Sequence, residues 1–345
     1  TTDDYLYEIC APLDFGYKID DDELFFVACM IFEGHCKRGL YKFTQLNNDV
    51  LDKFLAVLSK WGVEYSLRDR GNAYEVRILS GNGKITEILQ RYGIIDHLAY
   101  DKRLPKQFFE MCLKQRYDFI GIMLATDGWI NSGESQCVIS LANEGLIQDI
   151  QRLLGTCGIY SSYVHKLSKC NGKEFDSYSL AIPDEFITTV YDNCYCYYKQ
   201  DRLKERIDRI NSKDVKPYSN NVNYPKSVVS GCKELRKIKN KSWVKTSSFK
   251  RQWINDFSER TGLLADVATN DFVWQQVKSV EYDDTLIDMV DIEVEGAHNF
   301  IANGIVSHNS YSDIVMMAFI LGNDINADIS QLTGNPQKAA DADDT

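Results

Sequence analysis

The chain has 345 residues, of which 44% are hydrophobic and 26% charged, a composition typical of a folded protein with room for two domains. No apolar run approaches the ~20 residues that a bilayer crossing needs, and the first residues lack the basic and apolar regions of a signal peptide. The ten cysteines, mostly isolated, predict free thiols in a reducing compartment. We therefore expect an intracellular protein with no membrane partner, and we exclude secreted disulfide-rich proteins.

The net charge of −11 is unevenly distributed along the chain. Residues 201–252 hold fifteen Lys or Arg and only five Asp or Glu. Such a basic tract in an acidic chain indicates a local site for a polyanion, although a solvated connector explains the charge alone equally well. The candidate DNA-binding residues of this tract are Lys233, Arg236, Lys237, Lys239, Lys241, Lys245, Lys250 and Arg251.

An internal repeat organises the first 200 residues. An apolar helical run that begins at Leu24 ends in Glu33-Gly34, and a second run from Phe119 ends in Asp127-Gly128, so that the two acids are 94 residues apart. Periodicity predicts helices over 49–61 and 146–156, with strands over 40–45, 63–69, 74–79, 137–141, 159–166 and 178–182. Each unit therefore reads α-β-β-α-β-β-α, which makes the fold class α+β.

The two apolar helices predict a metal site. A helix that is apolar almost all round must be buried, so we expect the two to pack together, with small residues at Ala28, Gly121 and Ala125 allowing close approach. Two carboxylates, Glu33 and Asp127, would then meet at a pseudo-two-fold axis, where oxygen ligands suit Mg²⁺ and phosphodiester displacement. The alternative is a pair of surface acids, which the helix dipole disfavours at a C-terminal end.

These two motifs and the repeat around them resemble the monomeric LAGLIDADG homing endonucleases, over roughly Asp21 to Lys199. The resemblance implies two αββαββα repeats whose four-stranded sheets form a saddle on the major groove of double-stranded DNA. It implies Mg²⁺-dependent double-strand cleavage by a monomer at a long target site. It also implies a basic residue from each half near the scissile phosphate, for which Lys102 and Lys199 are the candidates. Glu33 stands where the family more often has Asp.

The last third of the chain carries a second motif. A strand-like alternation over 272–280 leads into residues 289–310, which closely resemble the C-terminal splicing motifs of inteins, in the β-rich C-terminal half of a Hint splicing domain. The side-chain amide of Asn309 can attack its own carbonyl and break the bond to Ser310, because the reacting atoms are held together covalently. The assisting residues are His308 at the scissile carbonyl or leaving amine, His298 as acid or base, Ser310 as downstream nucleophile and Asp291 as a tuning group.

The residues that an intein uses at its upstream junction are not found. The chain begins with Thr1 rather than Cys or Ser, and none of its five histidines fits a Thr-x-x-His element. We therefore expect a split-intein piece or a fragment, completed by an N-terminal intein half in trans or upstream, in the cytoplasm of a bacterial, archaeal or phage host.

The expected boundaries are 1–20 linker from the splicing domain, 21–115 first repeat, 116–200 second repeat, 201–268 basic DNA-contacting connector, 269–309 splicing segment and 310–345 downstream host segment. Two other interpretations stay open at this point. One is a DNA-binding module whose nuclease site is dead, and the other is an ordinary host enzyme in which His-Asn-Ser occurs by chance.

Overall fold

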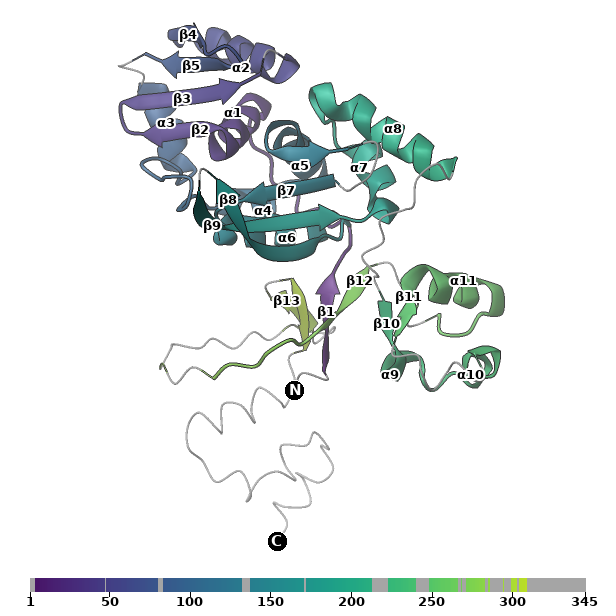
Figure 1. Ribbon diagram of the computed structural model, residues 1–345. Coiled ribbons are helices and arrows are strands. Elements are labelled where there is room, and N and C mark those ends of the chain that lie inside the picture. Colours follow the sequence, from purple (N-terminus) through teal and green to yellow (C-terminus); the bar gives the residue numbers. More distant parts are fainter. Residues whose placement is uncertain are drawn as a thin grey trace. The chain divides into compact units, whose positions relative to one another are not determined.

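The structure, a computed structural model, describes residues 4–46, 48–79, 83–131, 137–170, 172–212, 223–239, 248–265, 268, 271–282, 285, 294, 299–302 and 304–308. It divides into two compact units, one of residues 10–273 and one that joins residues 1–9 to those from 274 onward (Figure 1). None of the helices in the described residues has the length and apolar character that a bilayer crossing requires.

The larger unit begins with the first repeat. Its elements are α1 (Asp21–Phe32), β2 (Gly34–Lys37), β3 (Leu40–Gln45), α2 (Asp49–Lys60), β4 (Tyr65–Asp69), β5 (Tyr74–Ile78) and α3 (Gly83–Arg91). The four strands form an antiparallel sheet in the order β2-β3-β5-β4. This is the α-β-β-α-β-β-α order that the sequence predicts.

The second repeat has the same order and topology. After the short helix α4 (Lys106–Glu110) come α5 (Leu113–Thr126), β6 (Gly128–Ile130), β7 (Cys137–Leu141), α6 (Glu144–Gly155), β8 (Ser162–Cys170), β9 (Lys173–Ile182), the 3₁₀ turn η1 (Asp184–Phe186) and α7 (Ile187–Asn193). The sheet order β6-β7-β9-β8 matches that of the first repeat position by position. The repeat architecture and the α+β class are therefore confirmed.

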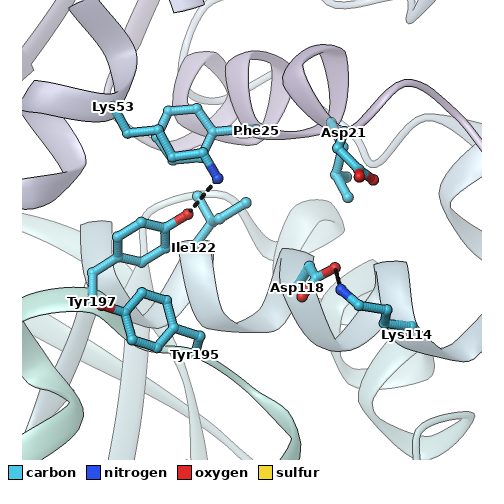
Figure 2. A pocket seen from close by; sticks show the side chains of 9 residues that line it. Asp21, Phe25, Lys53, Lys114, Asp118, Ile122, Tyr195 and Tyr197 are labelled. Atoms are coloured by element: carbon cyan, nitrogen blue, oxygen red, sulfur yellow. Dashed lines mark hydrogen bonds and ion pairs between the residues drawn. The ribbon is translucent and has the colours of Figure 1, made fainter. Parts of the chain in front are cut away.

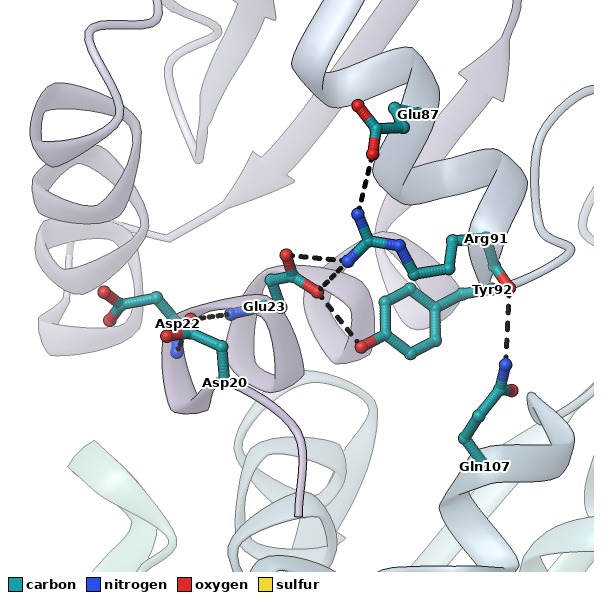
Figure 3. A network of polar contacts seen from close by, with 7 residues as sticks. All are labelled: Asp20, Asp22, Glu23, Glu87, Arg91, Tyr92 and Gln107. Atoms are coloured by element: carbon teal, nitrogen blue, oxygen red, sulfur yellow. Dashed lines mark hydrogen bonds and ion pairs between the residues drawn. The ribbon is translucent and has the colours of Figure 1, made fainter. Parts of the chain in front are cut away.

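Helix α1 is held firmly at its N-terminal end. The Asp20 side chain caps the helix by accepting hydrogen bonds from the backbone N–H groups of Asp22 and Glu23. The Glu23 carboxylate accepts two hydrogen bonds from Arg91 of α3, at 3.0 and 2.8 Å, and one from the Tyr92 hydroxyl at 3.1 Å (Figure 3). These contacts fix the axis of α1 and, with it, the position of its far end.

The central helices α1 and α5 pack against each other, as predicted. In α1 every residue from Leu24 to Ile31 is buried, and Ala28 and Ala125 are fully buried. The expected role of Gly121 at this contact is wrong, because a Cβ there would lie 2.3 Å from the carbonyl oxygen of Tyr195. Gly121 therefore makes room for the backbone that follows α7, not for α1.

The basic connector forms a small module. It follows η2 (Tyr197–Lys199) and α8 (Gln200–Asn211), which pack on the second repeat through α5 and α7. The module itself consists of β10 (Asn223–Pro225), α9 (Lys226–Val229), α10 (Lys233–Lys239), β11 (Ser248–Lys250) and α11 (Arg251–Thr261). Strands β10 and β11 pair antiparallel. Tyr224, Leu235, Phe249 and Phe257 are buried, so the module has an apolar core in spite of its charge.

The smaller unit is a β-sheet built from both ends of the chain. It contains β1 (Tyr5–Ile9), β12 (Phe272–Gln276), β13 (Asn299–Ala302) and β14 (Ile305–His308), in the order β12-β1-β14-β13. Strand β1 pairs antiparallel with β14, placing Glu8 opposite Ile305. The segment expected as a linker over residues 1–20 thus contributes a central strand to this sheet.

Candidate functional site

Glu33 and Asp127 occupy equivalent positions at the C-terminal ends of the paired helices. Each residue is the C-cap of its helix: the backbone N–H of Glu33 donates to the carbonyl of Cys29, and that of Asp127 donates to the carbonyl of Met123. Their side chains lie close together, so that each carboxyl group affects the pKa of the other. The structure therefore brings together the two acids that the sequence singled out.

The environment of this acid pair favours a shared proton. Burial, followed by the negative charge of Asp127, raises the pKa of Glu33 to about 7. Burial also raises the pKa of Asp127. Lys199 and Lys102 act in the opposite direction on both acids, because their positive charges favour the carboxylate forms. The environment of the pair thus favours a protonated carboxyl group, and the two lysines oppose it.

Two glycines allow the chain to turn sharply after each acid. A Cβ on Gly34 would lie 2.4 Å from the Cα of Met30, and a Cβ on Gly128 would lie 2.6 Å from the Cα of Leu124. Real Cβ atoms do not approach a backbone this closely, so no other residue fits without a shift of the helix end. The acid-glycine pairs of the sequence thus place each carboxylate at the junction of a helix and the first strand of a sheet.

Lys102 and Lys199 lie behind the acid pair in symmetry-related positions. Lys102 Nζ donates to the carbonyls of Met30, Ile31 and Gly34 at 2.7, 2.9 and 2.7 Å. The second lysine does the same at the end of α5: Lys199 Nζ lies 2.9, 3.3 and 2.6 Å from the carbonyls of Leu124, Thr126 and Gly128.

This geometry changes the role expected for the lysines. An ammonium group has three donors, and three carbonyls engage them in each case. In this arrangement the lysines cap the helix ends and act on the acid pair through their charge, rather than by donating to a phosphate. Burial lowers the pKa of Lys199 to about 8 and also lowers that of Lys102.

The donor set fits a hard divalent cation that is shared with a phosphate. Among the residues that the structure describes, no group of three or more His, Cys, Asp or Glu side chains could enclose a metal ion. Mg²⁺ does not need such a cage, because it commonly binds one or two carboxylates and fills its other positions with water and substrate oxygens. Glu33 and Asp127 supply that minimum set, and both are partly buried beside the open start of a sheet.

The candidate DNA-binding residues of the connector fall into three groups. Lys233, Arg236, Lys237 and Lys250 are exposed. Lys241 and Lys245 lie outside the described residues, and of Lys239 only the backbone is described.

Arg251 departs from the expectation of a DNA contact. Its side chain is only 9% exposed, lies 3.8 Å from the Glu185 carboxylate and stacks on the Phe186 ring at 5.1 Å. A buried guanidinium cannot reach a phosphate, so Arg251 anchors α11 to the second repeat instead.

The splicing motif is described only in part. Strands β13 and β14 form a hairpin that pairs Asn299 with His308, and Gly304 adopts a left-handed φ of 82° at its turn. The side chain of His308 is not described, and Asp291, His298, Asn309 and Ser310 lie outside the described residues. Beside the hairpin, β1 carries Glu8, which accepts a 2.6 Å hydrogen bond from Gln275.

A separate cavity of about 200 Å³ lies at the N-terminal ends of α1 and α5, away from the acid pair (Figure 2). Its charged groups are paired with their neighbours. Lys53 Nζ donates to the Tyr197 hydroxyl at 3.1 Å and lies over the Phe25 ring, and Lys114 forms a 2.6 Å ion pair with Asp118. The polar groups are used within the protein, so this cavity is not the candidate site.

The fold and acid pair thus have the architecture that the resemblance to LAGLIDADG endonucleases predicts: two repeats, each of which supplies one acid at their interface. The family model of the intein splicing domain matches residues 132–309, just over half of the chain. The chain therefore belongs to the intein splicing-domain family.

Similar curated proteins include replicative DNA helicases and an RNA polymerase subunit. The chain is 24% identical over 265 residues to the replicative DNA helicase DnaB of Synechocystis sp. and 26% identical over 267 residues to that of Nostoc sp.; each alignment covers 68% of this chain and 30% of the helicase. It is 21% identical over 335 residues to subunit Rpo1C of the DNA-directed RNA polymerase of Methanocaldococcus jannaschii, covering 85% of this chain and 36% of the subunit. The chain thus spans about a third of the length of these relatives.

Similar solved structures include a homing endonuclease and a DUF199/WhiA protein. The homing endonuclease I-DmoI, in complex with DNA and Mn, is 11% identical with a TM-score of 0.38, over 52% of this chain and 98% of I-DmoI. Full-length DUF199/WhiA from Thermatoga maritima is 11% identical with a TM-score of 0.38, over 73% of this chain and 78% of that protein.

Proposed function

We propose that this intein segment is a divalent-metal-dependent DNA endonuclease joined to the C-terminal half of a protein-splicing site. The observation that carries the nuclease proposal is the contact between Glu33 and Asp127 at the ends of two equivalent helices, with a buried lysine behind each. A structural role alone gives no reason to keep two acids in contact at the negative ends of two helix dipoles.

In the proposed reaction, Glu33 and Asp127 would hold Mg²⁺ at the scissile phosphate of double-stranded DNA. When bound, the metal activates water and neutralises charge that develops on the phosphate. Glu33 and Asp127 must lose their shared proton to serve as ligands, and the charges of Lys102 and Lys199 favour that loss. Exposed basic residues of the connector, such as Lys233 and Lys237, add affinity through phosphates without selecting sequence.

A cleavage selection tests the nuclease proposal. A plasmid library with randomised inserts would be incubated with the chain in Mg²⁺ or in EDTA, and the linearised molecules would be sequenced. We expect cutting within related inserts in Mg²⁺ and none in EDTA. If the chain binds the selected DNA but never cuts it, the chain is instead a DNA-binding module with a dead nuclease site.

For the splicing half, we propose cleavage after Asn309 by cyclisation of its side chain, with His308 and His298 as proton-transfer groups, Asp291 as a tuning group and Ser310 as the downstream nucleophile. The support is the family match, which ends at residue 309. Full splicing would require an N-terminal intein half, supplied in trans or upstream.

Intact mass measured over hours at neutral pH, beside Asn309→Ala, tests this cleavage. We expect the wild type to lose the segment from Ser310 onward, alone or once the N-terminal half is added, and the variant to stay whole. A wild type that stays whole in both conditions would overturn the splicing proposal.

A further inference from the structure

The outer faces of the two sheets start beside the acid pair. In each sheet one face is buried in the core, with Phe43 and Val76 in the first repeat and Ile139 and Leu180 in the second. Side chains alternate between faces, so the neighbouring residues of the same strands form the opposite, outer face. His35 and Trp129 stand on these outer faces two residues after Glu33 and Asp127, and DNA bound at the acids must therefore lie along both sheets.

In the first repeat this outer face is basic. Two rows of paired residues cross the sheet on this face. The row nearer the acid pair runs over all four strands and consists of His35, Lys42, Arg77 and Ser66. The row farther from the acid pair runs over β3, β5 and β4 and consists of Thr44, Glu75 and Arg68. Arg77 and Arg68 are exposed. Lys42 Nζ lies 3.5 Å from a carboxylate oxygen of Glu75, which confirms that the two rows share one face.

In the second repeat the matching positions carry no charge. The near row consists of Trp129, Val138, Ala181 and Ser162, and the far row of Ser140, Ser179 and Val164. Trp129 is 62% exposed and Val164 46%. The hydroxyl groups of Ser140 and Ser179 are hydrogen-bonded at 2.7 Å, so these rows also share one face. In these two rows the repeats thus have the same strand pairing but different chemistry, basic in the first and uncharged in the second; on the same face of β8, the next residue outward is the exposed Lys166.

We propose that the two sheets read different bases, with guanine favoured in the half-site under the first repeat and thymine in the half-site under the second. This inference rests on the proposed endonuclease function. Arg and Lys donate to the O6 and N7 acceptors that guanine presents in the major groove. Apolar side chains contact the thymine methyl group, and Val164 and Trp129 are the exposed ones on the second sheet. The target would therefore be asymmetric although the fold is nearly symmetric.

Binding selection with Asp127→Asn, which the proposed function predicts to leave bound DNA uncut, tests the inference. Randomised duplexes that the variant retains in Mg²⁺ would be sequenced. We expect guanine enriched on one flank of the selected site and thymine on the other. Selected sites with the same composition on both flanks would overturn the inference while leaving the endonuclease proposal intact. If no duplex is retained even by the wild type, both fail together.

Single substitutions identify which sheet reads which flank. Arg77→Gln should lower the preference for guanine at one position of the first flank by roughly 5- to 150-fold, with the second flank unchanged. Val164→Arg, which copies Arg68 of the first repeat, should create a guanine preference on the second flank. Lys60→Gln is the control and should change neither flank, because Lys60 ends α2 and its side chain pairs with Asp22 at the N-terminal end of α1, away from the acid pair. An unchanged guanine preference in Arg77→Gln would contradict the assignment of the basic rows.

Discussion

Glu33 and Asp127 stand where electrostatics disfavours two carboxylates. They are in contact, partly buried and located at the negative ends of two helix dipoles. Lys102 and Lys199 offset part of this cost. On the proposed function, such a site would trade stability of the protein for affinity toward a divalent cation, because a bound cation would offset the repulsion between the two carboxylates.

The first prediction concerns Glu33→Gln without metal. In the folded protein the pKa of Glu33 is raised to about 7, above its ordinary value of 4.5, so the folded state keeps a proton that the unfolded state releases. This proton stabilises the folded state of the wild type. The full contribution to the free energy of unfolding is present below about pH 4.5 and is lost as the pH rises through about 7.

The variant has no such proton to lose, so it should be more stable than wild type by about 1–3 kcal/mol at pH 8 and by less at pH 5. Urea unfolding at both pH values measures the difference. Glu64→Gln, at an exposed position, is the control and should show no such pH dependence. A Glu33→Gln effect of equal size at both pH values would contradict the account.

The second prediction concerns the turns after the acids. Gly128→Ala should cost about 2–4 kcal/mol of unfolding free energy, because its Cβ would lie 2.6 Å from the Cα of Leu124. Gly83→Ala is the matched control: no atom lies within 4 Å of its added Cβ, and the position begins a helix. Equal stability of the two variants would show that the turn tolerates a side chain.

At the scale of elements, the central feature is a pair of helix ends capped by distant lysines. The last carbonyls of an α-helix have no partner within the helix, and Lys102 and Lys199 each donate to two of them and to the carbonyl of the glycine that begins the next strand. Both lysines come from segments that follow their own sheets, so each cap ties the end of a repeat back to its beginning. The caps therefore fix where the acids point.

The third prediction follows from these caps. Lys199→Met should lower the unfolding free energy by about 2–4 kcal/mol, because it removes three hydrogen bonds to buried carbonyls. Lys102→Met should do the same for the first repeat. Lys204→Met, at an exposed position in α8, provides the control. A wild-type unfolding midpoint for Lys199→Met would mean that the caps contribute nothing to stability.

The repeat can be predicted from the sequence, but the start of α5 and the short strands β2 and β6 cannot. Helix α5 begins six residues before the predicted Phe119, because its first turns bury Gln115 and Arg116, whose polar groups bond to backbone oxygens of Ile19 and Thr156. Strands β2 and β6 are three or four residues long, too short for a period of two to be visible. The acids themselves were predictable, since an acid-glycine pair after an apolar run is local in sequence.

At the scale of the whole molecule, contacts between residues far apart in the chain could not be predicted from the sequence. Strand β1 pairs with β14 almost 300 residues later, and nothing local in Tyr5–Ile9 indicates that partner. The burial of Arg251 is equally non-local, because it depends on Glu185 and Phe186. Charge counting identified the basic tract but could not separate its anchoring residue from the exposed ones.

The fourth prediction concerns how this charge distribution affects DNA binding. The chain carries a net charge of −11, yet its connector presents exposed lysines, so affinity should fall steeply as salt increases. Lys233→Gln and Lys237→Gln should each reduce the slope of log K against log salt by roughly one. Lys114→Gln is the control and should leave the slope unchanged, because Lys114 lies beside the cavity at the N-terminal end of α5, whereas Asp127 lies at the C-terminal end. Binding titrations at several salt concentrations measure these slopes, and equal slopes for all four proteins would exclude the connector from the DNA interface.

The most direct test of the central claim compares cleavage with binding on a selected target duplex. Wild type, Glu33→Gln and Asp127→Asn would be assayed in Mg²⁺ for both DNA affinity and double-strand cutting. The account predicts that both variants bind like wild type and that each loses cutting by at least about 100-fold, because each removes one of only two carboxylate ligands. Cutting at the wild-type rate by either variant would show that the acid pair is not the catalytic centre.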